Sequence, residues 1–314
     1  MNGASILRLK TQAIMSKGGW EGRYNLPLYW MLLPAVVGLL VFSYYPMYGI
    51  IIAFQRYDPL LGFIRSPWVG MDNFTRMFAN KDFWEILRNT LVISLGKIAI
   101  GQVTAITFAL LLNELRHALF KRGVQTLTYL PYFFSWLVFA SIMKDVLQMD
   151  GVINSALKSI GLAPVYFLGN PTLFPFTMIF TDVWKGFGYG AIIFLAAITG
   201  IDPALQEAAA VDGANRFQRI WHVNLPAIAP IIVVTTTLAL GYVLSAGFEQ
   251  ILILYNPAVY STGDIIDTWV YRIGLVDYHF SQGAAVGLFK SVVGLALVFA
   301  SFYIARKAGD YKVF

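Results

Sequence analysis

The sequence contains no cysteine, and only 13% of its 314 residues carry a charge. The absence of cysteine excludes disulfide bonds, thiolate metal sites and thiol nucleophiles. A soluble domain usually has about a quarter of charged residues, whereas 58% of this chain is hydrophobic. We therefore expect an integral membrane protein. The formal net charge of +6 is better explained by basic cytoplasmic loops than by nucleic-acid binding.

The common catalytic motifs are also missing. A phosphate-binding loop has the pattern G-x-x-x-x-G-K-[ST], but the one Gly-Lys pair, Gly96-Lys97, is followed by Ile98. The HExxH and GxSxG patterns are absent. The three histidines lie far apart in predicted loops: His117, His222 and His279. We therefore predict no catalytic residue, no metal site and no cofactor in this chain, and we expect any ATP hydrolysis to belong to a partner.

Six apolar runs are long enough to form membrane-spanning helices, which need about 20 residues each. They cover residues 27–54, 89–112, 124–144, 173–199, 227–250 and 283–305. Strands of an outer-membrane barrel would alternate in polarity over about 10 residues, and the sequence lacks such alternation. We predict an all-α integral membrane protein with one six-helix domain, residues 27–305, and tails at 1–26 and 306–314.

The orientation follows from the distribution of basic residues, which favours cytoplasmic loops. One set of connecting segments, with both tails, holds 12 Lys and Arg, and the other set holds seven. This bias places both termini in the cytoplasm and loops 55–88, 145–172 and 251–282 outside. Within the first outer loop, helical spacing puts Phe74, Met77 and Phe78 on one face, which indicates a helix lying along the membrane interface.

The cytoplasmic segment 200–226 has an unusual pattern, and its part from Glu207 to Pro226 reads EAAAVDGANRFQRIWHVNLP. Asp202 is a suitable helix cap, and Pro203 suits a first helical position. A short helix with small side chains should follow, then a turn at Gly213 and a second short helix that ends before the fifth span. The segment either transmits movement to that span or is an ordinary solvated connector.

The pattern resembles the EAA loop of binding-protein-dependent ABC importer permeases. The residues that fill it are Glu207, Ala208, Ala209, Asp212, Gly213, Leu225 and Pro226. The stretches PAVVGLLVFSYYPMYGIIIAFQRYD and VGMDNFTRMF are similar to the carbohydrate-importer members of that family, including alginate and polysaccharide importers. The resemblance thus extends beyond the loop to much of the chain.

The resemblance implies the type I ABC importer permease fold, with the EAA loop as a coupling helix that contacts a cytoplasmic ATPase. It also implies that the chain lies in the bacterial inner membrane and works with a set of partners. These are a second homologous permease subunit, two ABC ATPase subunits that bind ATP and Mg, an extracytoplasmic solute-binding protein, an oligosaccharide substrate and the lipid bilayer.

Charged residues inside apolar runs are costly and are candidates for function. They are Lys97, Lys144, Asp145, Asp182, Lys185, Glu249 and Lys290. Asp182 and Lys185 are three residues apart on the fourth predicted span, so they can pair on one helical face. The alternatives are ion pairs between helices and charged ends that extend to the membrane surface.

The stretch TDVWKGFGYG in the fourth span combines charge, aromatic rings and glycines, which suits contact with a sugar. The candidate path residues are Asp182, Trp184, Lys185, Phe187 and Tyr189. A lysine in the path favours an acidic oligosaccharide. The alternative for the aromatic rings is packing against lipid or in the interfacial belt.

Three other classes of protein remain as alternatives. A stand-alone secondary sugar transporter predicts ion-coupling carboxylates within spans and inverted repeats, but only Asp182 lies well inside a span and the second half does not mirror the first. A membrane-embedded enzyme would need a catalytic set, which the sequence lacks. A scaffold would leave the EAA pattern without a purpose.

Overall fold

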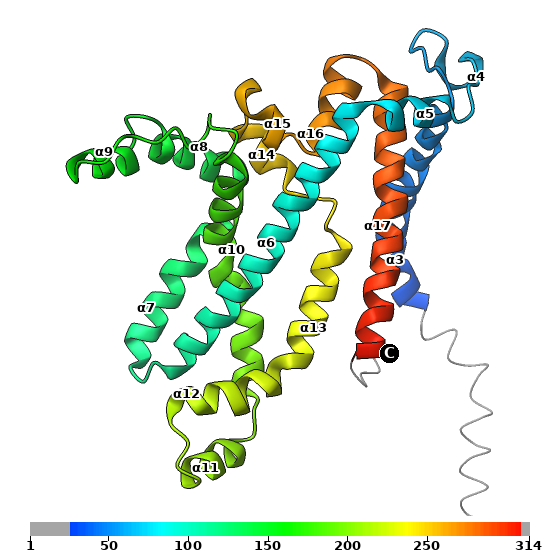
Figure 1. Cartoon of the computed structure of the whole chain (residues 1–314). Coiled ribbons are helices and arrows are strands. Elements are labelled where there is room, and N and C mark those ends of the chain that lie inside the picture. Colours follow the sequence, from blue (N-terminus) through cyan, green and yellow to red (C-terminus); the bar gives the residue numbers. More distant parts are fainter. Residues whose placement is uncertain (1–25, 309–314) are drawn as a thin grey trace, which may run out of the picture. The chain divides into compact units, whose positions relative to one another are not determined.

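The computed structural model describes residues 26–308 and the side chains of residues 28–303. This part of the chain is helical, and its single strand-like feature is an isolated bridge between Gln55 and Trp68 (Figure 1). The chain divides into two compact units, residues 1–51 and 52–314.

The first unit contains α3 (Leu26–Leu39), which continues through a π turn at Leu40–Tyr44 into a 3-10 helix, Tyr45–Phe54, that reaches the second unit. Because Pro46 has no N–H to donate, the regular α-helical ladder cannot continue through it. The N–H of Tyr45 instead bonds the carbonyl of Leu40 in the wider turn. The whole run from Leu28 to Phe54 is long and apolar enough to cross a membrane, as predicted for the first span.

The second unit contains the remaining helices. They are α4 (Gly62–Arg65), α5 (Asp72–Ala79), α6 (Lys81–Glu114), α7 (Ala118–Tyr129), α8 (Trp136–Leu147), α9 (Val152–Ser159), α10 (Phe174–Thr199), α11 (Pro203–Val211), α12 (Arg216–Arg219), α13 (Leu225–Gly241), α14 (Phe248–Leu254), α15 (Tyr260–Gly263), α16 (Ile266–Tyr271) and α17 (Phe280–Ala308). Two short 3-10 helices, Leu130–Phe133 and Pro257–Val259, and two π turns, Ile220–Asn224 and Arg272–Val276, connect some of them.

Four long helices form the frame of this unit. Helix α10 packs along α6 and also contacts α13, which packs in turn against α17 (Figure 1). With the first span, the described residues contain five helices long and apolar enough to cross a membrane, or six if the bent pair α7–α8 is counted as one span. The predicted all-α membrane fold is confirmed.

The third predicted span, residues 124–144, is not one straight helix. Helix α7 passes into the 3-10 turn at Leu130–Phe133, and the chain then bends by 105° before α8. Pro131 interrupts the α-helical hydrogen bonds, and Ser135 starts a new helix by accepting a hydrogen bond from the N–H of Val138 at 3.4 Å. Hydropathy predicts the apolar run but does not reveal the helix cap that divides it.

The fifth predicted span, residues 227–250, is also displaced. Its helix begins at Arg216 and ends at Gly241, and the backbone is unwound before α14 starts at Phe248. Gly247 adopts a φ of +91°, a left-handed conformation that L side chains rarely adopt. The last third of the predicted span is therefore a break followed by a short separate helix.

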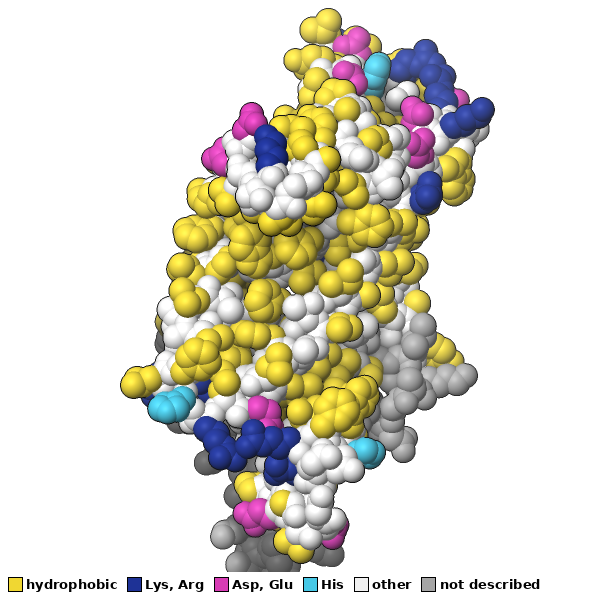
Figure 2. Space-filling model, turned by 60° about the vertical axis from the view of Figure 1, so that its left-hand side comes forward, with side chains coloured by type: hydrophobic (Ala, Val, Ile, Leu, Met, Phe, Trp, Pro, Cys, Tyr) yellow, Lys and Arg dark blue, Asp and Glu magenta, His cyan; other side chains and the backbone are white. Residues whose placement is uncertain are grey.

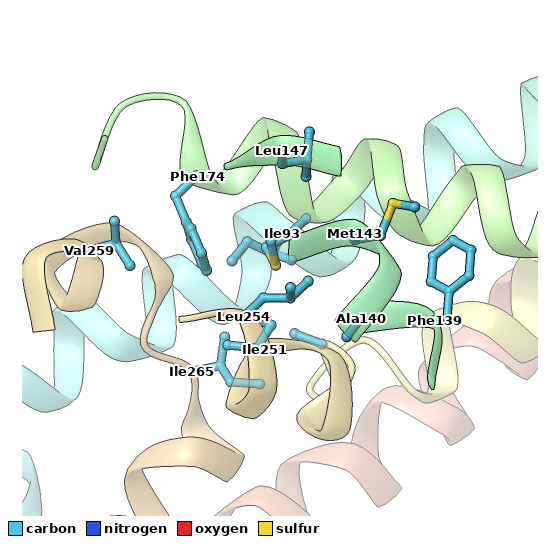
Figure 3. Close-up of a cluster of buried hydrophobic side chains, with 12 residues drawn as sticks. Ile93, Phe139, Ala140, Met143, Leu147, Phe174, Ile251, Leu254, Val259 and Ile265 are labelled. Atoms are coloured by element: carbon cyan, nitrogen blue, oxygen red, sulfur yellow. The ribbon is translucent and has the colours of Figure 1, made fainter. Parts of the chain in front are cut away.

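Helix α14 is enclosed by a cluster of buried apolar side chains (Figure 3). Ile251 and Leu254 of α14 lie among Ile93 of α6, Met143 of α8 and Phe174 of α10, all nearly inaccessible to solvent. This cluster ties the short helix to three longer ones. It thereby fixes the position of the unwound segment that precedes α14.

The helix predicted in the first outer loop is present as α5, and its apolar face packs largely inside the protein. Phe74 and Met77 are buried, whereas Phe78 is 43% exposed and makes edge-to-face contacts with the rings of Phe83 and Phe289. Asn73 also faces inward, donating hydrogen bonds to the carbonyls of two residues in the preceding segment. At the other end of the chain, α17 continues to Ala308. The predicted tails 1–26 and 306–314 otherwise lie outside the described residues, apart from Leu26.

Candidate coupling loop and membrane cavity

The segment between α10 and α13 contains an exposed short helix, α11. Asp202 accepts a hydrogen bond from the N–H of Ala204 at 2.9 Å, and a proline occupies the first turn, as the sequence predicts. Glu207 and Ala208 are exposed. An exposed carboxylate beside small side chains allows another protein to approach the backbone closely.

A glycine turn ends α11. Gly213 has a φ of +80°, its N–H bonds the carbonyl of Ala210 at 3.1 Å, and the N–H of Ala214 bonds the carbonyl of Ala209 at 2.9 Å. This pair of hydrogen bonds is the Schellman motif that closes many helices. The predicted glycine turn is confirmed, and the exposed Asp212 lies just before it.

The second helix of the loop, α12, begins with a capping box in which Asn215 and Gln218 exchange hydrogen bonds of 2.9 and 2.8 Å. It does not stop at Leu225 and Pro226, as the sequence suggested, but continues through the π turn Ile220–Asn224 into α13. The loop and the fifth span therefore share one continuous helix.

The π turn explains how the helix passes the proline. Pro226 has no N–H, so it occupies a place where the helical ladder lacks one bond. Just before it, the N–H of Leu225 bonds the carbonyl of Ile220, five residues back rather than four. Such π turns are often found at functional sites.

A side-chain hydrogen bond joins α11 to the last residue of the π turn, directly before α13. The amide of Gln206 donates to the side-chain oxygen of Asn224, which is only 2% exposed. A cavity of about 270 Å³ opens between the two arms of the loop. Its lining residues are Ala209, Asp212, Gly213, Ala214, Gln218, Arg219, His222 and Val223. Movement of α11 can thus reach α13 through this bond as well as through the backbone.

Inside the predicted membrane region, Asp182 of α10 pairs with Lys97 of α6 and not with Lys185. The carboxylate lies 3.4 Å from the Lys97 ammonium, whose side chain is 9% exposed. Lys97 also donates to the carbonyl of Ala246 at 2.7 Å and to the side-chain oxygen of Gln250. The lysine therefore connects α6, α10 and the unwound segment before α14.

Gln250 extends this network. It is fully buried, and its amide donates to the carbonyl of Met178 and the hydroxyl of Thr181, both at 2.8 Å. A Cβ on Gly247 would lie 2.7 Å from the Lys97 ammonium, which is too close. The absence of a side chain at Gly247 therefore leaves room for the Lys97 ammonium. Together these bonds satisfy the Ala246 carbonyl and the Gln250 side chain where the helix is interrupted.

A cavity of about 310 Å³ lies beside this network, between α6, α10 and α13. Lys97 and Asp182 line one part of it, and Gln102 reaches it from α6 while donating weakly to Thr235 of α13 at 3.2 Å. Phe187 forms an aromatic wall and packs edge-to-face on Phe108 at 5.0 Å. Three glycines in the lining leave backbone accessible: Gly101, Gly186 and Gly190. Charge, amide, hydroxyl and aromatic groups thus surround one space.

Lys185 lies elsewhere. It is 8% exposed, donates to the carbonyl of Tyr132 at 2.9 Å, and has its ammonium 5.2 Å from the ring centroids of both Tyr132 and Trp136. These contacts hold the bend between α7 and α8 against α10. Tyr189 also contacts this bend, because its ring stacks on that of Tyr132 at 3.8 Å.

The five candidate path residues are therefore divided among three places. Asp182 and Phe187 line the cavity between α6, α10 and α13, whereas Lys185 and Tyr189 pack on the bend. Trp184 is 42% exposed and lines a separate apolar cavity with Phe187. Of the other intramembrane charges, Lys290 pairs with Asp267 at 2.6 Å.

A charged cluster on the predicted outer side was missed in the sequence. Asp264, 2% exposed, accepts a hydrogen bond from Thr268 at 2.7 Å and pairs with Arg272, whose guanidinium lies 4.5 Å from the ring centroid of Tyr260. Burial, with a contribution from Tyr260, raises the pKa of Tyr255 to about 12, so this phenol stays neutral at physiological pH. The cluster orders the outer loop 251–282.

Comparison with known proteins gives a consistent result. Residues 100–308 match the family described as the inner membrane component of binding-protein-dependent transport systems. The polygalacturonan/rhamnogalacturonan transport system permease YteP of Bacillus subtilis is 44% identical over 91% of this chain and 90% of its own length. Protein LplB of the same organism is 43% identical over 91% of each chain.

Solved structures agree. A chain in the crystal structure of a bacterial ABC transporter involved in the import of the acidic polysaccharide alginate superposes with a TM-score of 0.85 and 38% identity, covering 92% of this chain and 98% of that one. A second structure of a bacterial alginate transporter contains the alginate pentasaccharide-bound periplasmic protein, and its matching chain has the same TM-score. The chain therefore belongs to the sugar-importing ABC transporter permeases, the inner membrane components of binding-protein-dependent transport systems.

Proposed function

We propose that this chain is one of two permease subunits of an ATP-driven importer that moves an oligosaccharide, acidic in character, into the cytoplasm. The observation that carries the proposal is the exposed helix α11, joined to α13 through the Gly213 turn and the continuous helix that begins at Arg216, and also by the Gln206–Asn224 hydrogen bond. A connector without a partner would not need such an exposed small-residue surface on a rigid support.

In this proposal α11 contacts a cytoplasmic ATPase subunit, through Glu207 and the small side chains around it. Two ATPase chains bind ATP and Mg, and their closure displaces α11. The displacement reaches α13 and, through its neighbours, the cavity between α6, α10 and α13. Both termini lie in the cytoplasm, and a solute-binding protein docks on loops 55–88, 145–172 and 251–282.

The sugar path runs along the cavity that contains Asp182, Lys97, Gln102 and Phe187. Carboxylate, ammonium and amide groups can exchange hydrogen bonds with sugar hydroxyls, and an aromatic wall suits the apolar face of a sugar ring. A second permease subunit would complete the path from the other side. Because Asp182 balances the charge of Lys97, acidic character in the substrate is supported by the relatives rather than by this cavity.

Reconstitution tests the proposal. The chain is co-purified with its neighbouring permease, ATPase and binding-protein chains and placed in proteoliposomes, and uptake of uronate-containing and neutral oligosaccharides is measured with and without ATP inside. ATP-dependent uptake that needs the binding protein supports the proposal. Uptake by the isolated chain, driven by a proton gradient, would instead support a secondary transporter.

Asp182→Asn and Asp145→Asn form a matched pair for the path. Asp182 lines the cavity, whereas Asp145 is exposed on α8. The first variant should change the KM for the transported sugar, and the second should leave it unchanged. Equal effects of the two variants would remove the cavity from the proposed path.

A further inference from the structure

A group of basic side chains gathers where α6 ends and α7 and α12 begin. This basic patch consists of Arg116, Lys121, Arg122, Arg216 and Arg219. Figure 2 shows Lys and Arg side chains collected in a band beneath a broad hydrophobic surface. The Arg216–Glu114 contact, 4.0 Å long, brings α12 beside the end of α6.

The basic patch has few partners within the described part of the chain. Arg216 has only the long contact with Glu114, and the other four side chains form no ion pair there. Asp212 lines the same cavity as Arg219 but forms no ion pair with it. The Nε atom of Arg219 is buried without a hydrogen-bond partner. Among the described residues, the five basic side chains therefore have one ion-pairing carboxylate, that of Glu114.

Lys121 and Arg122 lie where a positive charge does not stabilise their own helix. They lie at the fourth and fifth residues of α7, close to the helix end whose backbone dipole is positive. A cation near that end is disfavoured by the dipole. Their placement there is explained better by an anion outside the chain than by the stability of the helix.

Large apolar side chains are exposed among these cations. Leu119 and Phe120 precede Lys121 on α7 and are 80% and 61% exposed, and Phe217 and Trp221, on the helix that begins at Arg216, are 68% and 53% exposed. Aromatic and basic side chains together at the end of apolar spans are typical of the headgroup layer of a bilayer. The general excess of Lys and Arg in cytoplasmic loops would explain these cations, but it would not explain the exposed aromatic rings beside them.

We propose that the basic patch is a binding site for the phosphate of an anionic phospholipid, with Leu119, Phe120, Phe217 and Trp221 in contact with the adjoining acyl region. Basic clusters beside membrane spans attract anionic headgroups. The phosphate would supply the charge that Glu114 leaves unbalanced. It would also link the α6–α7 turn to α12, and hence to the helix that carries the coupling loop.

An acidic protein surface is the competing occupant, and the exposed side chains favour lipid. A soluble partner would have to cover four large apolar side chains as well as the cations, whereas a bilayer meets both kinds of group at one depth. The small-residue surface of α11, which suits a protein partner, is a separate part of the loop.

The test measures lipid binding to the purified full chain in detergent by native mass spectrometry, titrating dioleoyl phosphatidylglycerol and, separately, dioleoyl phosphatidylcholine. Phosphatidylglycerol should bind more tightly, and added salt should weaken it. Each basic residue near an anionic headgroup contributes about fivefold in affinity. The triple variant Arg116→Gln, Lys121→Gln, Arg122→Gln should therefore bind phosphatidylglycerol on the order of 100-fold more weakly.

The matched control removes three exposed basic residues from the predicted outer side: Arg56→Gln, Arg65→Gln and Arg88→Gln. Its affinity for phosphatidylglycerol should be unchanged. If the patch triple variant does not fold, the single variant Arg116→Gln, in the loop before α7, gives the same test. It should weaken phosphatidylglycerol binding about fivefold.

Three results would overturn the proposal. The first is equal loss of lipid binding in the patch variant and in the control. The second is a patch variant that retains phosphatidylglycerol but no longer co-purifies with the ATPase chain, because the basic patch would then be a protein interface. The third is equal competition by soluble glycerol phosphate, which would indicate a site for free phosphate.

Discussion

Replacing Lys97 with methionine tests the polar network that holds the unwound segment between α13 and α14. Methionine keeps much of the length and volume of the side chain but removes its charge and its donors. The carbonyl of Ala246 and the side-chain oxygen of Gln250 would lose a donor, and Asp182 would lose its ion-pair partner. We expect the variant to insert in the membrane and to be less stable.

The magnitude follows from these contacts. A buried acceptor that loses its partner costs about 1–3 kcal/mol, and breaking a buried ion pair by removing one partner costs about 3–5 kcal/mol. Because the Asp182 side chain is 34% exposed, water can solvate its carboxylate once the pair is broken, so the pair counts for about 1 kcal/mol beside about 1 kcal/mol for each of the two acceptors. A total of about 3 kcal/mol is expected, which corresponds to a fall in melting temperature of about 6 °C for a chain of this size.

The assay is thermal unfolding of purified chains in one detergent. Asp182→Asn alone should cost about 1 kcal/mol, because Lys97 keeps two neutral acceptors. The double variant should lose less than the sum of the single variants, since it leaves no unpaired carboxylate. Lys144→Met, at an exposed position, should melt within about 1 °C of the wild type. Strict additivity, or a Lys97→Met protein as stable as the wild type, would refute the reasoning.

Other perturbations test the loop and the bend. Glu207→Lys should reduce the coupling of ATP hydrolysis to uptake without affecting insertion, as measured in proteoliposomes, and Gly213→Pro should do the same because proline cannot adopt a φ of +80°. Gln206→Leu should lower the transport-to-hydrolysis ratio by removing the link to α13, whereas an unchanged ratio would leave the backbone as the sole connection. Lys185→Ala should lower the melting temperature and the uptake of acidic and neutral sugars together, because the lysine supports the bend through Tyr132. A larger loss for acidic sugars would instead show that the lysine contacts the substrate.

The local features of the coupling loop could be predicted from the sequence because their causes are local. A cap at Asp202 and a positive φ at Gly213 depend on residues within one or two turns. The family resemblance rested on this stretch and on two stretches nearer the start of the chain, and comparison with known proteins confirmed it.

The features that sequence reasoning missed depend on contacts between distant residues. Lys97 has no partner near it in sequence, so its contacts with Asp182 and Gln250 emerge only when α6, α10 and α14 pack together. For the same reason Lys185 was expected to pair along its own helix, although the carbonyl of Tyr132 on a neighbouring element satisfies it.

Individual residues mark the breaks in the third and fifth predicted spans, although the mean hydropathy of each run stays high across the break. Pro131 followed by Ser135 is a possible helix end and helix start, and Gly247 marks a position free to turn. An apolar stretch interrupted by such residues is better interpreted as two short helices than as one span.

The central claim is that α11 is the cytoplasmic contact between this permease and an ATPase. Because the chain has no cysteine, Val211→Cys introduces a single thiol on α11 at a position 88% exposed, and Leu60→Cys does so in the first outer loop at a position 94% exposed. A membrane-impermeant maleimide added to intact spheroplasts should label only the second variant. In inverted vesicles it should label the first, and an assembled ATPase should protect that thiol. Labelling of Val211→Cys from outside, or equal labelling with and without the ATPase, would contradict the account.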